Sequence, residues 1–203
     1  IIVGALLTLG GWLGGILQLL PMLWRERGTT WHARSCMAAL LCGLGGLLLW
    51  FAFLVGENPL YAFASIKIGT FGFLLPLYLT VAHRMFPFFA GNVVAGYKPW
   101  RPLWLLAAFW VLLLAHLLLE LIHAYAWLWL ADVPLLGLAL LMNWKLWPRG
   151  RMPGLLAVLF IGLSWLPLTF ALYAGQMLYM PKVAWWAFAM VQVVAVMRIV
   201  GEL

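Results

Sequence analysis

Long, almost unbroken apolar stretches dominate this chain, and only short polar loops separate them. Several reach the roughly 20 residues that a helix needs to cross the hydrocarbon core of a bilayer. Hydrophobic residues fill 67% of the 203 positions and charged residues only 8%, whereas a water-soluble domain has about 25% charged residues. Only a helix satisfies all its backbone hydrogen bonds within one continuous apolar run. The chain is therefore predicted to be all-α, a polytopic transmembrane helical bundle.

About seven spans are expected, within a single membrane domain over residues 1–203. They lie near residues 1–23, 36–55, 61–82, 103–123, 131–147, 155–178 and 183–200. The fifth span is short. The third has an alternative end near Val94, because residues 85–94 are also largely apolar. Pro76 and Pro167 lie inside spans and are expected to kink them.

Basic residues are concentrated in alternate loops. Residues 24–35, 83–102 and 145–153 each contain three Lys or Arg, whereas the intervening loops hold Glu57, Asp132 and Lys182. The positive-inside rule places the basic loops in the cytoplasm, with the N-terminus outside and the C-terminus cytoplasmic. The net charge of +7 therefore indicates orientation in a lipid bilayer, and no nucleic-acid partner is expected.

Glycines recur at helical spacing in three of the spans. They are Gly10, Gly11, Gly14 and Gly15 in the first, Gly43 and Gly46 in the second, and Gly69 and Gly72 in the third. Small residues let helix backbones approach closely in a membrane. Packing within the chain is the favoured interpretation. The alternative is a homo-oligomer or a membrane-protein partner that contacts the Gly-rich first helix.

Ionisable residues inside the fourth span mark a candidate site, because each is costly in lipid unless it is paired or hydrated. His116, Glu120 and His123 fall within about 60° of one another on a helix. Such a face is suited to a metal or a haem in a helical bundle, which is the favoured interpretation for the histidines. For Glu120, a structural ion pair with Lys67 at similar depth is an equal alternative.

A second candidate is the adjacent pair His83 and Arg84, between an apolar helix and a Pro-Phe-Phe turn. Imidazole ligates iron or copper, and guanidinium pairs with carboxylates such as a haem propionate. From the residues alone, an interfacial anchor is favoured, with Arg84 reaching lipid phosphates. His32, in a loop beside three arginines, is expected to be solvated. No catalytic motif is present, so no residue is assigned a catalytic role.

Residues 73–89, FLLPLYLTVAHRMFPFF, resemble the signature of the NnrS family of bacterial inner-membrane proteins. The resemblance continues through KPWRP at 98–102, His116 with Glu120, SWLP at 164–167 and LYAGQ at 172–176. It covers residues 66–180 well and residues 1–60 poorly.

The resemblance implies a protein of the nitric-oxide and nitrosative-stress response that contains haem and/or copper, with no defined reaction. It implies that His83 is a metal or haem ligand with Arg84 as its electrostatic partner. It likewise strengthens the cofactor role of His116 and the metal role of Glu120. The metal role of His123 depends on the shared helix face alone.

Two features expected from the resemblance are missing. One is a histidine-containing segment near the start, and the other is a Gly-His-x-Gly-Arg-type motif between Met180 and Pro181. The chain is therefore interpreted as a reduced relative or as part of a longer one. Alternative functions are a non-catalytic scaffold subunit of a larger complex and, ranked last, a small-solute transporter with mid-membrane Lys67 and Glu120.

Overall fold

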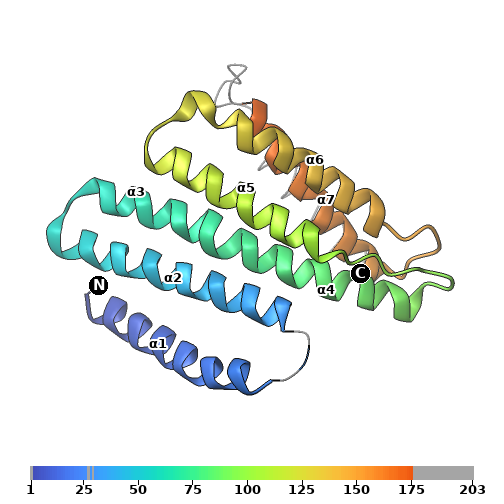
Figure 1. Cartoon of the computed structure of the whole chain (residues 1–203), viewed down its shortest axis with the longest axis horizontal. Helices are drawn as coiled ribbons and strands as arrows, with labels where there is room; N and C mark the ends of the chain where they lie inside the picture. Colours follow the sequence, from blue (N-terminus) through green and yellow to red (C-terminus); the bar gives the residue numbers. More distant parts are fainter. Residues whose placement is uncertain (1, 27, 29, 176–203) are drawn as a thin grey trace. The chain divides into compact units, whose positions relative to one another are not determined.

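The structure, a computed structural model, describes residues 2–26, 28 and 30–175, and this part of the chain contains helices and no strand. The elements are α1 Ile2–Arg25, α2 Trp31–Gly56, α3 Pro59–Lys67, η1 Ile68–Leu74, α4 Leu75–Val93, α5 Leu103–Leu121, η2 Tyr125–Trp127, α6 Trp129–Leu146 and α7 Gly154–Gly175 (Figure 1). Here η1 is a π-helix and η2 a 3₁₀-helix. The all-α prediction is confirmed.

Six helical segments of the described chain are long and apolar enough to cross a membrane, and they correspond to the first six predicted spans. The third follows the alternative end, because α3, η1 and α4 form one continuous segment through Pro87 to Val93. Transmembrane helices tolerate such a proline when neighbouring groups compensate the lost hydrogen bond. The seventh span lies outside the described residues. The orientation of the termini stays a prediction.

The third span contains a π-helix where a proline kink was expected. The backbone N–H of Leu75 bonds to the carbonyl of Thr70, five residues back, which widens the turn immediately before Pro76. Proline brings no N–H to the helix ladder. The distortion in the third span is therefore a widened, π-helical turn that precedes the proline.

The hairpin between α2 and α3 follows from its sequence. Glu57 adopts a left-handed conformation, with φ of 52°, where α2 ends. Asn58 then caps α3, because its Oδ1 accepts a hydrogen bond from the N–H of Leu60 at 3.0 Å. Pro59 occupies the first helical position, where its missing N–H costs nothing. The chain thus reverses direction between the second and third spans.

Several charged residues that the sequence analysis placed in loops lie within helices, and three of them occupy helix ends that suit their charge. Arg25 and Lys145 occupy the last turns of α1 and α6, and Asp132 occupies the first turn of α6. These positions complement the helix macrodipole. Asp132 is only 1% exposed and lies inside α6, so its placement in a loop is wrong, whereas its position within the predicted span 131–147 is confirmed. The side of the membrane on which it lies stays a prediction.

The chain divides into two compact units. The first consists of residues 2–85 and 101–131 of the described chain. Within it, α1 packs on α2, α2 packs on α3 and η1, and α5 packs on η1 (Figure 1). The second unit consists of residues 86–100 and 132–175. Its aromatic cluster has Phe160 at its centre, with the rings of Phe86 and Trp147 at 5.6 and 5.9 Å.

Glycines of the first unit divide into two groups. A Cβ added at Gly43 would lie 2.7 Å from the Trp12 ring, and one at Gly72 would lie 3.2 Å from Cβ of Cys42. These glycines pack helices within the chain, as predicted. By contrast, apart from the adjacent residues and local backbone of α1 itself, nothing in the described chain lies within 4 Å of such a Cβ at Gly10, Gly11, Gly14 or Gly15. For these glycines of α1, packing within the described chain is not observed, and contact with a partner stays a prediction.

Candidate functional site

Two histidines from different helices meet in the first unit. Nε2 of His32 on α2 lies 3.0 Å from Nδ1 of His83 on α4, and the ring centroids are 5.2 Å apart. His83 is 1% exposed, and His32 is half-buried. The expectation that His32 is solvated in a loop is wrong, because α2 begins at Trp31 and so carries His32 in its first turn.

The carbonyl of Pro102 determines where the protons of this pair lie. A carbonyl oxygen only accepts hydrogen bonds, so His83 donates its Nε2–H to Pro102, at 3.1 Å. In a neutral imidazole the other nitrogen then carries the lone pair. Nδ1 of His83 therefore accepts the Nε2–H of His32, and by the same rule the lone pair of neutral His32 lies on its own Nδ1.

This last nitrogen is the available ligand atom of the pair. Both ring nitrogens of His83 are engaged, by Pro102 and by His32. The Nδ1 atom of His32, in contrast, forms no hydrogen bond with any residue that the structure describes. The hydrogen-bonded chain from Pro102 through His83 to His32 thus holds one imidazole in a fixed tautomer, with a lone pair that no described residue engages.

Arginine side chains make the surroundings of the histidine pair positive. Arg84 and Arg101 both interact electrostatically with His32, and Arg101 also does so with His83. Both arginines are exposed. A guanidinium at such a position is suited to an anionic group, for which it offers charge and paired N–H donors.

A buried network next to the pair ties three helices together. Thr80 on α4 donates to the carbonyl of Pro76 at 2.7 Å, so Ser35 on α2 is the donor in its 2.6 Å bond to Thr80. Trp110 on α5 in turn donates its indole N–H to Ser35 Oγ at 2.7 Å. This network fixes α2 and α4 about one turn from His32 and His83.

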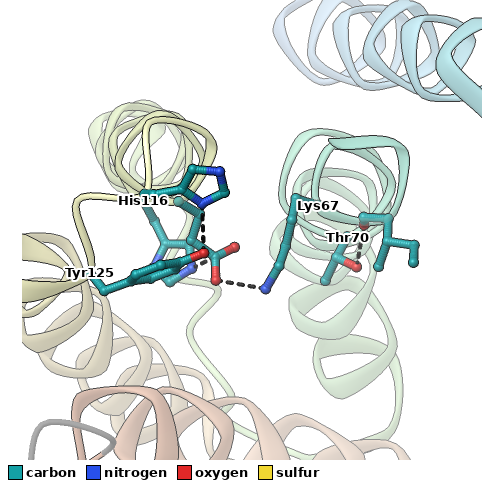
Figure 2. Close-up of polar contacts among 7 residues, drawn as sticks. Lys67, Thr70, His116 and Tyr125 are labelled. Carbon is teal, nitrogen blue, oxygen red and sulfur yellow. Dashed lines mark hydrogen bonds and ion pairs between the residues drawn. The ribbon is translucent and has the colours of Figure 1, made fainter. Parts of the chain in front are cut away.

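A second polar centre lies between α3 and α5 (Figure 2). Lys67 Nζ donates to Glu120 Oε1 at 2.6 Å, and His116 Nε2 lies 3.6 Å from Glu120 Oε2. His116 and Glu120 are 0% and 4% exposed, and the ring of Phe71 lies 4.0 Å from that of His116. The ion pair between Lys67 and Glu120, one of the two alternatives for Glu120, is confirmed.

His123 does not share the helix face of His116 and Glu120. Helix α5 ends at Leu121, and His123 adopts a φ of 58°, so the projection at 100° per residue fails there. His123 is exposed, and its Nδ1 lies 2.8 Å from the hydroxyl of Tyr125. Within the described residues, no group of three or more His, Cys, Asp or Glu side chains is placed to hold a metal ion.

The two polar centres are well separated. His83 bonds to Pro102, immediately before α5 begins, whereas His116 lies near the other end of the same helix. At 1.5 Å per residue these positions are about 20 Å apart along the helix. The structure brings His116 together with Glu120, and His83 together with His32. It does not gather the predicted ligands at one site.

The sequence matches the model of the family described as NnrS protein over residues 1–179. This chain belongs to the NnrS family. The predicted resemblance is confirmed, and the match begins at residue 1, so it also includes residues 1–60 and with them His32. Membership and six apolar helices make this an NnrS-like multi-pass membrane protein. No curated protein and no solved structure matches the chain.

Proposed function

We propose that this NnrS-like protein binds haem and/or copper at the His32–His83 pair and acts in the nitric-oxide and nitrosative-stress response of the bacterial inner membrane. The histidine pair carries the proposal, since it presents an imidazole nitrogen that is unpaired among the described residues, held in place by the buried His83. Neutral imidazole is the most common metal ligand among side chains.

The residues of the pair take different roles in this proposal. His32 holds the metal through Nδ1. His83 positions His32, as an outer partner that accepts its other ring N–H, an arrangement found around most metal-ligating histidines. Arg84 and Arg101 suit the carboxylates of a haem. The bound group supplies one-electron and small-ligand chemistry, which the side chains of the pair lack.

The geometry supports a different role for the second centre. Lys67 already neutralises Glu120, and His123 lies elsewhere. We therefore assign His116 and Glu120 a structural role, with the cofactor at the histidine pair. The metal roles predicted for His116, Glu120 and His123 gain no support from the contacts of the described residues.

Cofactor content of the purified protein tests the proposal. The full chain is solubilised in mild detergent, optical spectra are recorded in oxidised and reduced forms, and haem and copper are quantified chemically. Wild type is expected to carry haem, copper or both. His83→Ala should weaken retention about 10- to 100-fold, the usual cost of losing an outer partner, whereas His123→Ala should retain the wild-type content.

Two results would contradict the proposal. One is wild-type protein, folded and of full length, that contains neither haem nor copper. The other is retention in His83→Ala equal to that in the His123→Ala control. Circular dichroism and size-exclusion chromatography on each variant separate loss of a ligand from loss of the fold.

A scaffold subunit is the second candidate function. The observation that favours it is the open space around the glycines of α1, which no described residue fills. A partner helix could approach closely there. Crosslinking through α1 followed by purification should then recover a stoichiometric membrane partner or a second copy of the chain. Recovery of the uncrosslinked monomer alone would remove this candidate.

A further inference from the structure

An apolar groove in the first unit runs between the beginnings of α2 and α5. Its volume is about 390 Å³, and its lining includes Trp31, Arg34 and Ala38 of α2 and Leu103, Ala107 and Trp110 of α5. Arg34 is the one charged residue among the described residues that line it. The groove is large enough for a ligand, since ligand pockets commonly have volumes of about 300–1,000 Å³.

We propose that this groove binds an acyl chain of an anionic phospholipid, with the lipid phosphate held by Arg34. The groove lies on the exposed surface of two helices that are long and apolar enough to span a membrane, and its residues Trp31, Leu103 and Ala107 are exposed. A bilayer supplies acyl chains to such a surface directly. Basic pockets between transmembrane helices on the cytoplasmic side are known to take anionic lipid headgroups.

The polar groups of the groove leave an apolar surface for the acyl chain. Trp110 donates its only N–H to Ser35, and Ser35 is bonded to Thr80. These groups therefore have no need of a hydrogen bond from a ligand. A ligand that fills this groove must consequently be apolar along the part that lies inside, which excludes a free phosphate and favours a hydrocarbon chain.

The charge at the end of the groove suits a phosphate. Arg34 is exposed and lies in the first turn of α2, where it lines the groove. Helices α2 and α5 both begin here, at Trp31 and Leu103, so the positive ends of two macrodipoles meet at the same place. No acidic side chain is present among the described lining residues. A zwitterionic headgroup would gain less from this field.

The test compares lipid retention in defined mixtures. Full-length protein is exchanged into nanodiscs that contain phosphatidylglycerol or phosphatidylcholine, and bound lipid is counted by native mass spectrometry after release. Wild type should retain phosphatidylglycerol preferentially. Arg34→Gln should lower that retention about fivefold, the effect of one basic residue near an anionic lipid, and Arg34→Lys should keep it.

Two further variants test the apolar part of the groove against matched controls. Ala107→Trp fills the groove and should displace the lipid, whereas Leu114→Trp on the exposed surface of the same helix should not. Arg25→Gln removes a charge from the last turn of α1, outside the groove, and should leave retention unchanged.

Three outcomes would overturn the proposal. They are equal retention of the two lipids, equal losses in Arg34→Gln and Arg25→Gln, and a loss of haem in Ala107→Trp while the lipid stays bound. The last outcome would indicate that the groove binds the cofactor and not a lipid. Should Ala107→Trp fail to fold, the comparison of Arg34→Gln with Arg34→Lys and Arg25→Gln still tests whether Arg34 holds the lipid, since these three substitutions change exposed residues.

Discussion

Removal of either partner of the Lys67–Glu120 ion pair is expected to destabilise the protein, and by unequal amounts. The Glu120 side chain is 5% exposed and that of Lys67 is 23% exposed. Lys67→Met therefore leaves a carboxylate with almost no access to water. Glu120→Gln leaves an ammonium that regains part of its hydration by extending along its flexible stem.

The magnitudes follow from this difference in burial. Breaking a buried ion pair from one side costs about 3–5 kcal/mol. Glu120→Gln should lie at the lower end, about 3 kcal/mol, and Lys67→Met at the upper end, about 5 kcal/mol. The double variant Lys67→Met/Glu120→Leu should cost less than either single change, because no charge then remains unpaired and apolar replacement of a buried pair is often neutral.

The assay is reversible unfolding in mixed micelles, with helix content followed by circular dichroism as the denaturing detergent is increased. Lys98→Met, which removes an exposed lysine in the loop before α5, is the matched control and should lie within about 0.5 kcal/mol of wild type. The reasoning is refuted if both single changes match this control. It is also refuted if the losses simply add in the double variant.

Three further predictions concern packing, a buried hydroxyl and pH. Gly43→Ala should cost about 1–3 kcal/mol of unfolding free energy through overpacking, whereas Gly45→Ala, with nothing within 4 Å, should be neutral or stabilising in the same detergent titration. Ser35→Ala removes the acceptor of the Trp110 N–H and should cost about 1–3 kcal/mol; a Tm equal to wild type would contradict this. Burial raises the pKa of the Tyr97 phenol above its ordinary value, so the folded chain holds this proton more tightly than the unfolded chain. Stability should therefore fall as pH rises above about 10, and less steeply in Tyr97→Phe.

Much of the fold was predictable because a bilayer imposes it. Among the described residues, each apolar run long enough to cross the membrane is a helix. The ion pair of Lys67 with Glu120 follows from counting depth along two spans. The helix ends were less predictable. Helix α2 begins at Trp31 rather than near residue 36, because a helix can continue past its apolar run into the polar interface.

Only one of the two histidines of the candidate site was predicted from the sequence. His83 stands out through its motif, but its partner His32 lies 51 residues away and was assigned to a loop. Apolar periodicity does not encode the register between two helices. One signal was available, since the predicted orientation puts His32 and His83 at the same cytoplasmic level. His123 was wrongly placed on the face of His116 and Glu120, because no residue type near Leu121 indicates that the helix ends there.

The most direct test of the central claim compares cofactor content in His32→Ala and His116→Ala, purified side by side. Both variants remove one imidazole, but from centres about 20 Å apart along α5. If the histidine pair holds the cofactor, His32→Ala should lose the haem or copper signal while His116→Ala keeps it. Retention in His32→Ala together with loss in His116→Ala would contradict the assignment and move the cofactor to the centre beside Glu120.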